Sequence, residues 1–197
     1  MPPIVHGFDP PERFVAGTVG EPGARTFFLQ ARDGARVVSV ALEKQQVAAL
    51  AERVDELLDE VMNEARTTAV IPAVAPVGLA DEDPLDLPIA EEFRAGTMTL
   101  SWDPQAERVV IEVFPVGEEL VGLADADDVE EILLDETEPT EVFVVRIDAG
   151  HARAFVQRAE RVLGAGRPDC PFCGHPIDPD GHLCVRANGF KRRPEQE

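Results

Sequence analysis

The sequence lacks the residues on which several classes of enzyme depend. It has no tyrosine, one tryptophan and only two serines, Ser39 and Ser101, both of which lie inside predicted strands. It contains neither a G-x-S-x-G pattern nor a glycine-rich loop of the kind that cradles phosphate groups. Nucleophilic serine catalysis and nucleotide binding through such a loop are therefore not expected.

Cysteine and long apolar runs are also scarce. The three cysteines crowd into residues 170–184, which is a poor framework for disulfides and a reasonable set of metal ligands. No segment approaches the roughly 18 apolar residues that span a bilayer, and the first residues lack the basic and apolar regions of a signal peptide. We therefore expect a cytoplasmic protein that is neither exported nor embedded in a membrane.

Basic residues are few, because 18 Lys and Arg stand against 38 Asp and Glu, for a net charge of −20. Such a chain repels nucleic acid and anionic membranes unless its charge is segregated. Residues 118–141 hold eleven carboxylates and no base, whereas Arg186, Lys191, Arg192 and Arg193 follow near the C-terminus. We interpret these as a solvated acidic loop and an ordinary basic tail, with partners of opposite charge as the alternative.

The first half is typical of strands followed by a helix. Alternating apolar residues predict strands over 14–19, 26–32 and 36–42, and Asp33-Gly34 predicts a tight hairpin between the last two. Apolar residues then recur with a helical period, which predicts an amphipathic helix over 44–66.

The second half repeats this plan. Strands are predicted over 97–102, 108–114 and 142–147, and a helix follows whose apolar spacing matches that of the first helix displaced by 105 positions. The fold class is therefore α+β, with two βββα-like units, antiparallel sheets and one long helix each. The matched spacing makes the two units a candidate internal repeat.

These patterns divide the chain into a body and a C-terminal module. The α+β body covers residues 1–166, with halves at 1–66 and 94–166 and a proline-rich extended connector at 67–93. A zinc-ribbon-like module follows at 167–190, and a basic, polar tail at 191–197. One further short helix is predicted within the acidic residues 125–135.

The module carries the strongest chemical signal in the chain. Cys170 and Cys173 form a C-x2-C turn, and His182 and Cys184 follow at a spacing that can complete a tetrahedron. The pattern C-x2-C-x8-H-x-C predicts one zinc site. Four protein ligands leave no open position, so this zinc is expected to be structural and to fold the module rather than to catalyse.

Two alternatives to this ligand set remain open. His175 could replace His182 as the nitrogen ligand, although it follows Cys173 so closely that the chelate would be cramped. The C-x-x-C thiols could also be metal-free and redox-active. In thioredoxin-like proteins, however, this motif follows a strand and opens a helix, and neither element is predicted here.

Two histidines of the body are weaker candidates for chemistry. His151, at the start of a predicted helix, has Asp148 nearby and could form an acid–base pair, but a surface histidine at a helix start is the simpler interpretation. His6, near Asp9 and Glu12, is a weaker candidate for acid–base chemistry than His151. No catalytic residue is assigned.

The hairpin, the long helix and the closing run Cys-Pro-x-Cys-Gly-x-Pro-x-Asp-Pro-x-Gly-His-x-Cys-x-Arg-x-Asn-Gly over residues 170–189 resemble an actinobacterial family called domain of unknown function 3090. Val185 stands where the family pattern leads us to expect proline, which bears only on the local turn. The resemblance implies an actinobacterial cytosolic protein. It also implies a pathway or complex shared with proteins similar to histidine phosphatases and lipid kinases, encoded by neighbouring genes.

Taken together, these patterns favour a zinc-binding protein with a non-enzymatic, protein-interaction or scaffold role. The first alternative is nucleic-acid binding through the zinc module, with Arg186 and the basic residues 191–193 against phosphates. The second is an enzyme with a pocket between the two halves, at His151 and Asp148.

Overall fold

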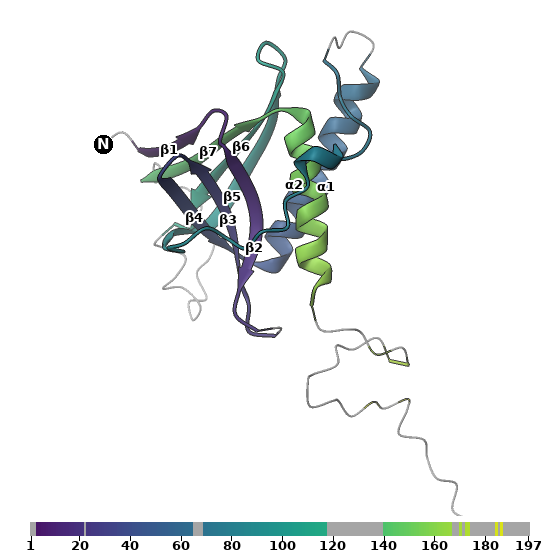
Figure 1. Ribbon diagram of the computed structural model, residues 1–197. Helices are drawn as coiled ribbons and strands as arrows, with labels where there is room; N and C mark the ends of the chain where they lie inside the picture. Colours follow the sequence, from purple (N-terminus) through teal and green to yellow (C-terminus); the bar gives the residue numbers. More distant parts are fainter. Residues whose placement is uncertain are drawn as a thin grey trace, which may run out of the picture.

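The computed structural model describes residues 3–21, 23–64, 69–117 and 140–166, together with Cys170, Phe172, Cys173, Cys184 and Arg186. This part of the chain is a mixed α+β fold with one seven-stranded sheet and two helices (Figure 1). The α+β class predicted from the sequence is confirmed.

Most elements lie where the hydrophobic periodicity predicts them. The strands are β1 (Ile4–Phe8), β2 (Arg13–Val19), β3 (Thr26–Asp33), β4 (Arg36–Leu42), β5 (Glu91–Asp103), β6 (Arg108–Pro115) and β7 (Glu141–Ile147). The helices are α1 (Lys44–Asn63) and α2 (Ala149–Gly164), and a short 3-10 turn, η1 (Val77–Leu79), lies between the halves. Strand β1 was not predicted, β5 begins earlier than residue 97, and α1 ends before residue 66. The helix predicted within 125–135 lies outside the described residues.

Local sequence explains where several elements begin and turn. Gly34 adopts a positive φ of 56° in the β3–β4 hairpin, a conformation that glycine reaches without steric cost. Helix α1 begins where the Gln46 side chain accepts a hydrogen bond from the backbone N–H of Glu43 at 2.9 Å. Helix α2 begins where Asp148 accepts one from the backbone N–H of His151 at 2.9 Å. Both contacts satisfy donors that a helix start leaves unpaired.

The two halves share one sheet rather than forming the separate antiparallel sheets that the sequence predicted. The strand order is β1-β7-β6-β5-β4-β3-β2. Strands β2 to β4 and β5 to β7 are antiparallel within each half, whereas β4 and β5 are parallel neighbours that join the halves. Each half thus contains three consecutive antiparallel strands followed by a helix, and the first half has in addition β1, which pairs in parallel with β7. The internal repeat stays a hypothesis.

The sheet is strongly curled. Strands β1 and β2 lie at opposite edges, yet only residues 9–12 connect them. Six strand spacings of about 4.8 Å would separate the edges of a flat sheet by about 29 Å, whereas this connection spans less than roughly 20 Å. The rings of Phe14 on β2 and Phe8 on β1 accordingly lie 6.4 and 5.9 Å from that of Phe143 on β7. Curling therefore brings the two edges together over one aromatic cluster.

Both helices pack side by side against the curled sheet (Figure 1). The ring of Phe155 on α2 stacks on Phe14 with a centroid distance of 4.7 Å. Each helix adds one apolar face to the core, as the helical spacing predicted. The residues of these faces are Val47, Leu50, Val54, Leu58, Ala152, Val156 and Ala159.

The connector between the halves is clamped by arginines. We call residues 69–90 the strap. Arg158 of α2, 6% exposed, donates to the carbonyl oxygens of Asp81 and Asp83 at 2.9 and 2.7 Å and to that of Ala16 on β2 at 2.8 Å. Arg13 of β2 donates to the Asp81 carboxylate at 2.6 Å. The strap is thus tied to β2 and α2 at once.

The strap also fills a small apolar site on the outer face of the sheet. Leu85 is buried against Val15, Phe28 and Ala41. A Cβ atom at position 17 would lie only 2.6 Å from the Leu85 side chain, so Leu85 would have to shift if a larger residue replaced Gly17. The predicted connector is therefore anchored to the body at Leu85, while most of its other described residues remain exposed.

Acid should loosen this clamp. The Arg13 guanidinium, hydrogen-bonded to Asp81, holds the pKa of that carboxyl below its ordinary value of 3.8. Because the pKa is lowered in the folded state, the stabilisation is complete above that value and is lost as pH falls through it toward the folded pKa. We expect Asp81→Asn to lower the free energy of unfolding at pH 7 by about 1–3 kcal/mol and to flatten its decline below about pH 4 in urea denaturation.

The matched control is Glu160→Gln. Glu160 is an exposed carboxylate of α2 with no ion pair to the described residues. This variant should leave both the stability at pH 7 and the acid profile unchanged. An equal effect of the two variants would contradict the clamp.

Candidate metal centre

The three cysteines converge although the sequence separates them into two groups. Cys170 and Cys184 are each only 5% exposed, and Cys173 is partly exposed. The turn that contains Phe172 and Cys173 lets the first two thiols lie on one side of the backbone.

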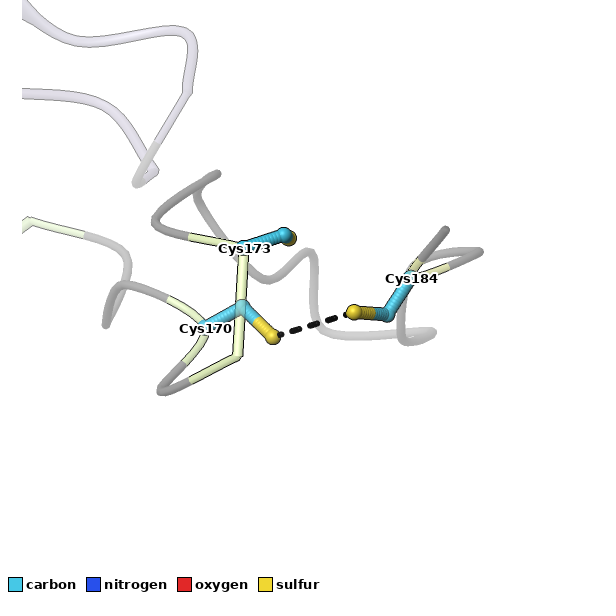
Figure 2. Close-up of side chains that lie close together, drawn as sticks. All are labelled: Cys170, Cys173 and Cys184. Atoms are coloured by element: carbon cyan, nitrogen blue, oxygen red, sulfur yellow. Dashed lines mark hydrogen bonds between the residues drawn. The ribbon is translucent and has the colours of Figure 1, made fainter. Parts of the chain in front are cut away.

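The three sulfur atoms lie close enough together to surround one ion. All three Sγ atoms lie within 4.8 Å of one another, and those of Cys170 and Cys184 are 3.6 Å apart (Figure 2). An ion held by each sulfur at about 2.3 Å would separate two tetrahedral thiolates by about 3.8 Å. The three cysteines form no disulfide. This trio can therefore hold a metal ion.

The surroundings of Cys170 favour its ionised form. Burial acts to raise the pKa of its thiol, but hydrogen bonds from the backbone N–H groups of Phe172 and Cys173, together with hydrogen bonding to the Cys184 and Cys173 thiols, outweigh this effect. The pKa of Cys170 is consequently lower than that of an ordinary cysteine. Thiolate is the form that ligates metals.

The nitrogen ligand is not decided by this geometry. Both His182 and its competitor His175 lie outside the described residues, so their roles remain predictions. The same holds for Lys191, Arg192 and Arg193. Arg186 is described, and its guanidinium donates a hydrogen bond to the Phe172 carbonyl at 3.3 Å, which links the two cysteine-bearing segments.

His151 and Asp148 do lie together, as one hypothesis required. His151 Nδ1 is 2.9 Å from Asp148 Oδ2, and both side chains are about half exposed. Burial acts to raise the pKa of Asp148, but the hydrogen bonds from the backbone and side chain of His151 outweigh it, so this pKa is lowered. The carboxylate serves mainly as the N-terminal cap of α2.

A surface groove of about 470 Å³ beside His151 is formed by the strap, β2 and α2. His151 lines this groove, whereas Asp148, its hydrogen-bond partner, does not. The groove's two arginines, Arg13 and Arg158, already donate to Asp81 and to carbonyl oxygens of the strap. Little donor capacity is left there for a substrate anion.

His6 has partners that sequence reasoning did not find. Its Nε2 atom lies 3.0 Å from Glu141 Oε2 and 3.9 Å from Glu92 Oε1. The acids considered from the sequence have other partners, because Asp9 lies near Arg146 and Glu12 contacts Arg32. No local signal could have indicated carboxylates that lie 86 and 135 positions away along the chain.

A pair of substitutions at Asp148 tests its capping role. Asp148→Ala removes the side-chain acceptor and should lower the free energy of unfolding by about 1 kcal/mol in urea denaturation. Asp148→Asn keeps an acceptor and removes the charge, so most of the stability should remain. Equal destabilisation by both changes would contradict capping and indicate a role for the charge.

Comparisons with known proteins place the chain in a family. No helix in the described part of the chain is long and apolar enough to cross a membrane. No curated protein and no solved structure matches the chain. The model of a family described as "Protein of unknown function (DUF3090)" matches residues 6–184, a stretch that contains the whole described body from His6 onward and all three cysteines. The chain belongs to this family.

Proposed function

We propose that this is a cytoplasmic, zinc-stabilised protein whose role is to bind other proteins rather than to catalyse a reaction. The observation that carries the proposal is the convergence of three thiols that lie close enough together to surround one ion. Thiolate ligands favour zinc over magnesium, calcium or manganese, which prefer oxygen. Reduced, metal-binding cysteines also suit the cytoplasm.

In this proposal His182 completes the site of Cys170, Cys173 and Cys184. The bound ion would then have four protein ligands and no position for water or substrate, which is the arrangement of structural zinc. When bound, zinc supplies folding energy to residues 167–190, because so short a segment buries little apolar surface of its own.

The candidate catalytic groups of the body are engaged in structural contacts, which supports an interaction role over catalysis. Ser39 is 1% exposed and accepts a hydrogen bond from Gln30, so it is no exposed nucleophile. Asp148 caps a helix, and Arg13 and Arg158 clamp the strap. Arg186 is directed at the Phe172 carbonyl, which favours a role in shaping the module over a role in contacting phosphates. The expected partners are proteins.

Metal analysis tests the site. Full-length protein purified under reducing conditions should contain about one zinc ion per chain by mass spectrometry. Cys184→Ser and His182→Ala should each remove most of it, whereas His175→Ala should retain it, because His175 is not a ligand in this proposal. Loss of zinc in His175→Ala with retention in His182→Ala would reverse the ligand assignment. Absence of metal from the wild-type protein would reopen a redox role for Cys170 and Cys173.

Zinc removal should affect the module and spare the body. A strong chelator should expose residues 167–190 to limited proteolysis while the circular dichroism of the α+β body persists, because only the module depends on the ion. Loss of the whole circular dichroism signal would show that the ion also stabilises the sheet.

Affinity purification tests the interaction role. Proteins that bind the full-length chain should be retained by His175→Ala and lost with Cys184→Ser, since only the latter unfolds the module. Salt-dependent retardation of DNA or RNA that disappears when Lys191, Arg192 and Arg193 are replaced by alanine would instead support nucleic-acid binding.

A further inference from the structure

Three side chains from different strands converge at one end of the sheet. They are His6 of β1, Glu92 of β5 and Glu141 of β7. His6 is 9% exposed, and its Nε2 atom faces both carboxylates, at 3.0 Å from Glu141 and 3.9 Å from Glu92. All three ligand-type atoms lie within 4.8 Å of one another.

Strand lengths explain why these residues meet. Strand β6, which separates β5 from β7, ends at Pro115 opposite Ala95 of β5. Strand β5 extends beyond that point to Glu91, and β1 pairs with β7 from Ile4 opposite Glu141. Because β6 has ended at this level, no strand separates β5 from β7, and Glu92 and Glu141 can approach each other and His6.

The rest of the described body brings carboxylates together in a different way. Five arginines each lie within 4.0 Å of two carboxylates, and a guanidinium neutralises one charge of each pair while it hydrogen-bonds to oxygen. These arginines are Arg13, Arg32, Arg94, Arg146 and Arg153. At the sixth pair, Glu92 and Glu141, the central cation is replaced by a histidine.

This replacement changes what the pair can bind. A guanidinium has only donors and cannot ligate a metal, whereas a neutral imidazole offers a lone pair that can. A protonated His6 would offset only one of the two carboxylate charges, in a protein whose net charge is already −20. A divalent ion bound to neutral His6 and both carboxylates would offset both charges.

We propose that His6, Glu92 and Glu141 bind a divalent transition-metal ion of the series from Fe²⁺ to Zn²⁺. One imidazole and two carboxylates form a mixed nitrogen and oxygen set that suits these ions better than Mg²⁺ or Ca²⁺, which prefer oxygen alone. Bond lengths of about 2.0–2.2 Å place neighbouring ligand atoms about 3.0–3.5 Å apart around such an ion. The observed 3.0 and 3.9 Å separations require only a small movement of Glu92, whose side chain is 44% exposed.

This site differs in kind from the cysteine site. Three protein ligands leave at least one coordination position for water or for a small ligand. The ligands also come from the body, so the ion would bind whether or not the C-terminal module is folded. The competing interpretation is a plain ion pair in which His6 stays protonated and no metal binds.

Calorimetry with Zn²⁺ distinguishes the two interpretations. Full-length protein already loaded with one zinc ion should bind one further ion per chain. Glu92→Gln should weaken this second binding at least tenfold, whereas Glu91→Gln, at the adjacent residue with a side chain 42% exposed, should leave it within twofold. The Cys184→Ser variant should lose the first ion and keep the second, which separates this site from the cysteine site.

Folding controls keep the result decisive. Both glutamine variants replace partly exposed side chains, so their thermal unfolding without added metal should match that of the wild-type protein. His6→Arg would place an arginine between two carboxylates, as at the five other pairs. This variant should fold but bind no second ion. Absence of a second ion in folded wild-type protein, or equal second binding by Glu92→Gln and Glu91→Gln, would overturn the proposal.

Discussion

The body depends on the short connection between β1 and β2, two strands that lie at opposite edges of the sheet. Because residues 9–12 cannot span a flat seven-stranded sheet, the sheet must curl until β1 and β2 lie within reach of this connection. Curling places Phe14 against Phe143 and Phe155, which seats α2 on the sheet. At the start of this connection β1 pairs in parallel with β7, and this pairing brings His6 to Glu141. The constraint of chain length thus shapes the core, and the adjoining strand pairing shapes the proposed site in the body.

Arginine is the second organising element of this acidic protein. Its planar guanidinium can donate to two carboxylates or to several carbonyl oxygens at once, which suits a chain with more acids than bases. Arg158 uses all of its nitrogen atoms to fix the strap and β2 to α2. Charge that would otherwise destabilise the compact state through repulsion is thereby turned into cross-links between elements distant in sequence.

The two candidate metal sites would serve different purposes because their donor atoms differ. The thiol trio is soft and is completed within one short segment, so its ion would organise that segment. The His6 site uses harder donors that an already folded sheet brings together, so an ion there would occupy a preformed position. The proposed cysteine site has four protein ligands and therefore no open coordination position. The His6 site has three protein ligands and would leave at least one position open.

The sequence by itself determined the features that depend on neighbours along the chain. Alternating and helical apolar periods located six strands and both helices, because each element buries one face whatever its partners are. The C-x2-C-x8-H-x-C spacing likewise indicated that Cys170, Cys173 and Cys184 would act together. Tertiary structure alone decided the merging of two expected sheets into one, the clamping of the strap and the partners of His6. These depend on strand order and curl, which bring together residues more than 50 positions apart, and no local pattern records them.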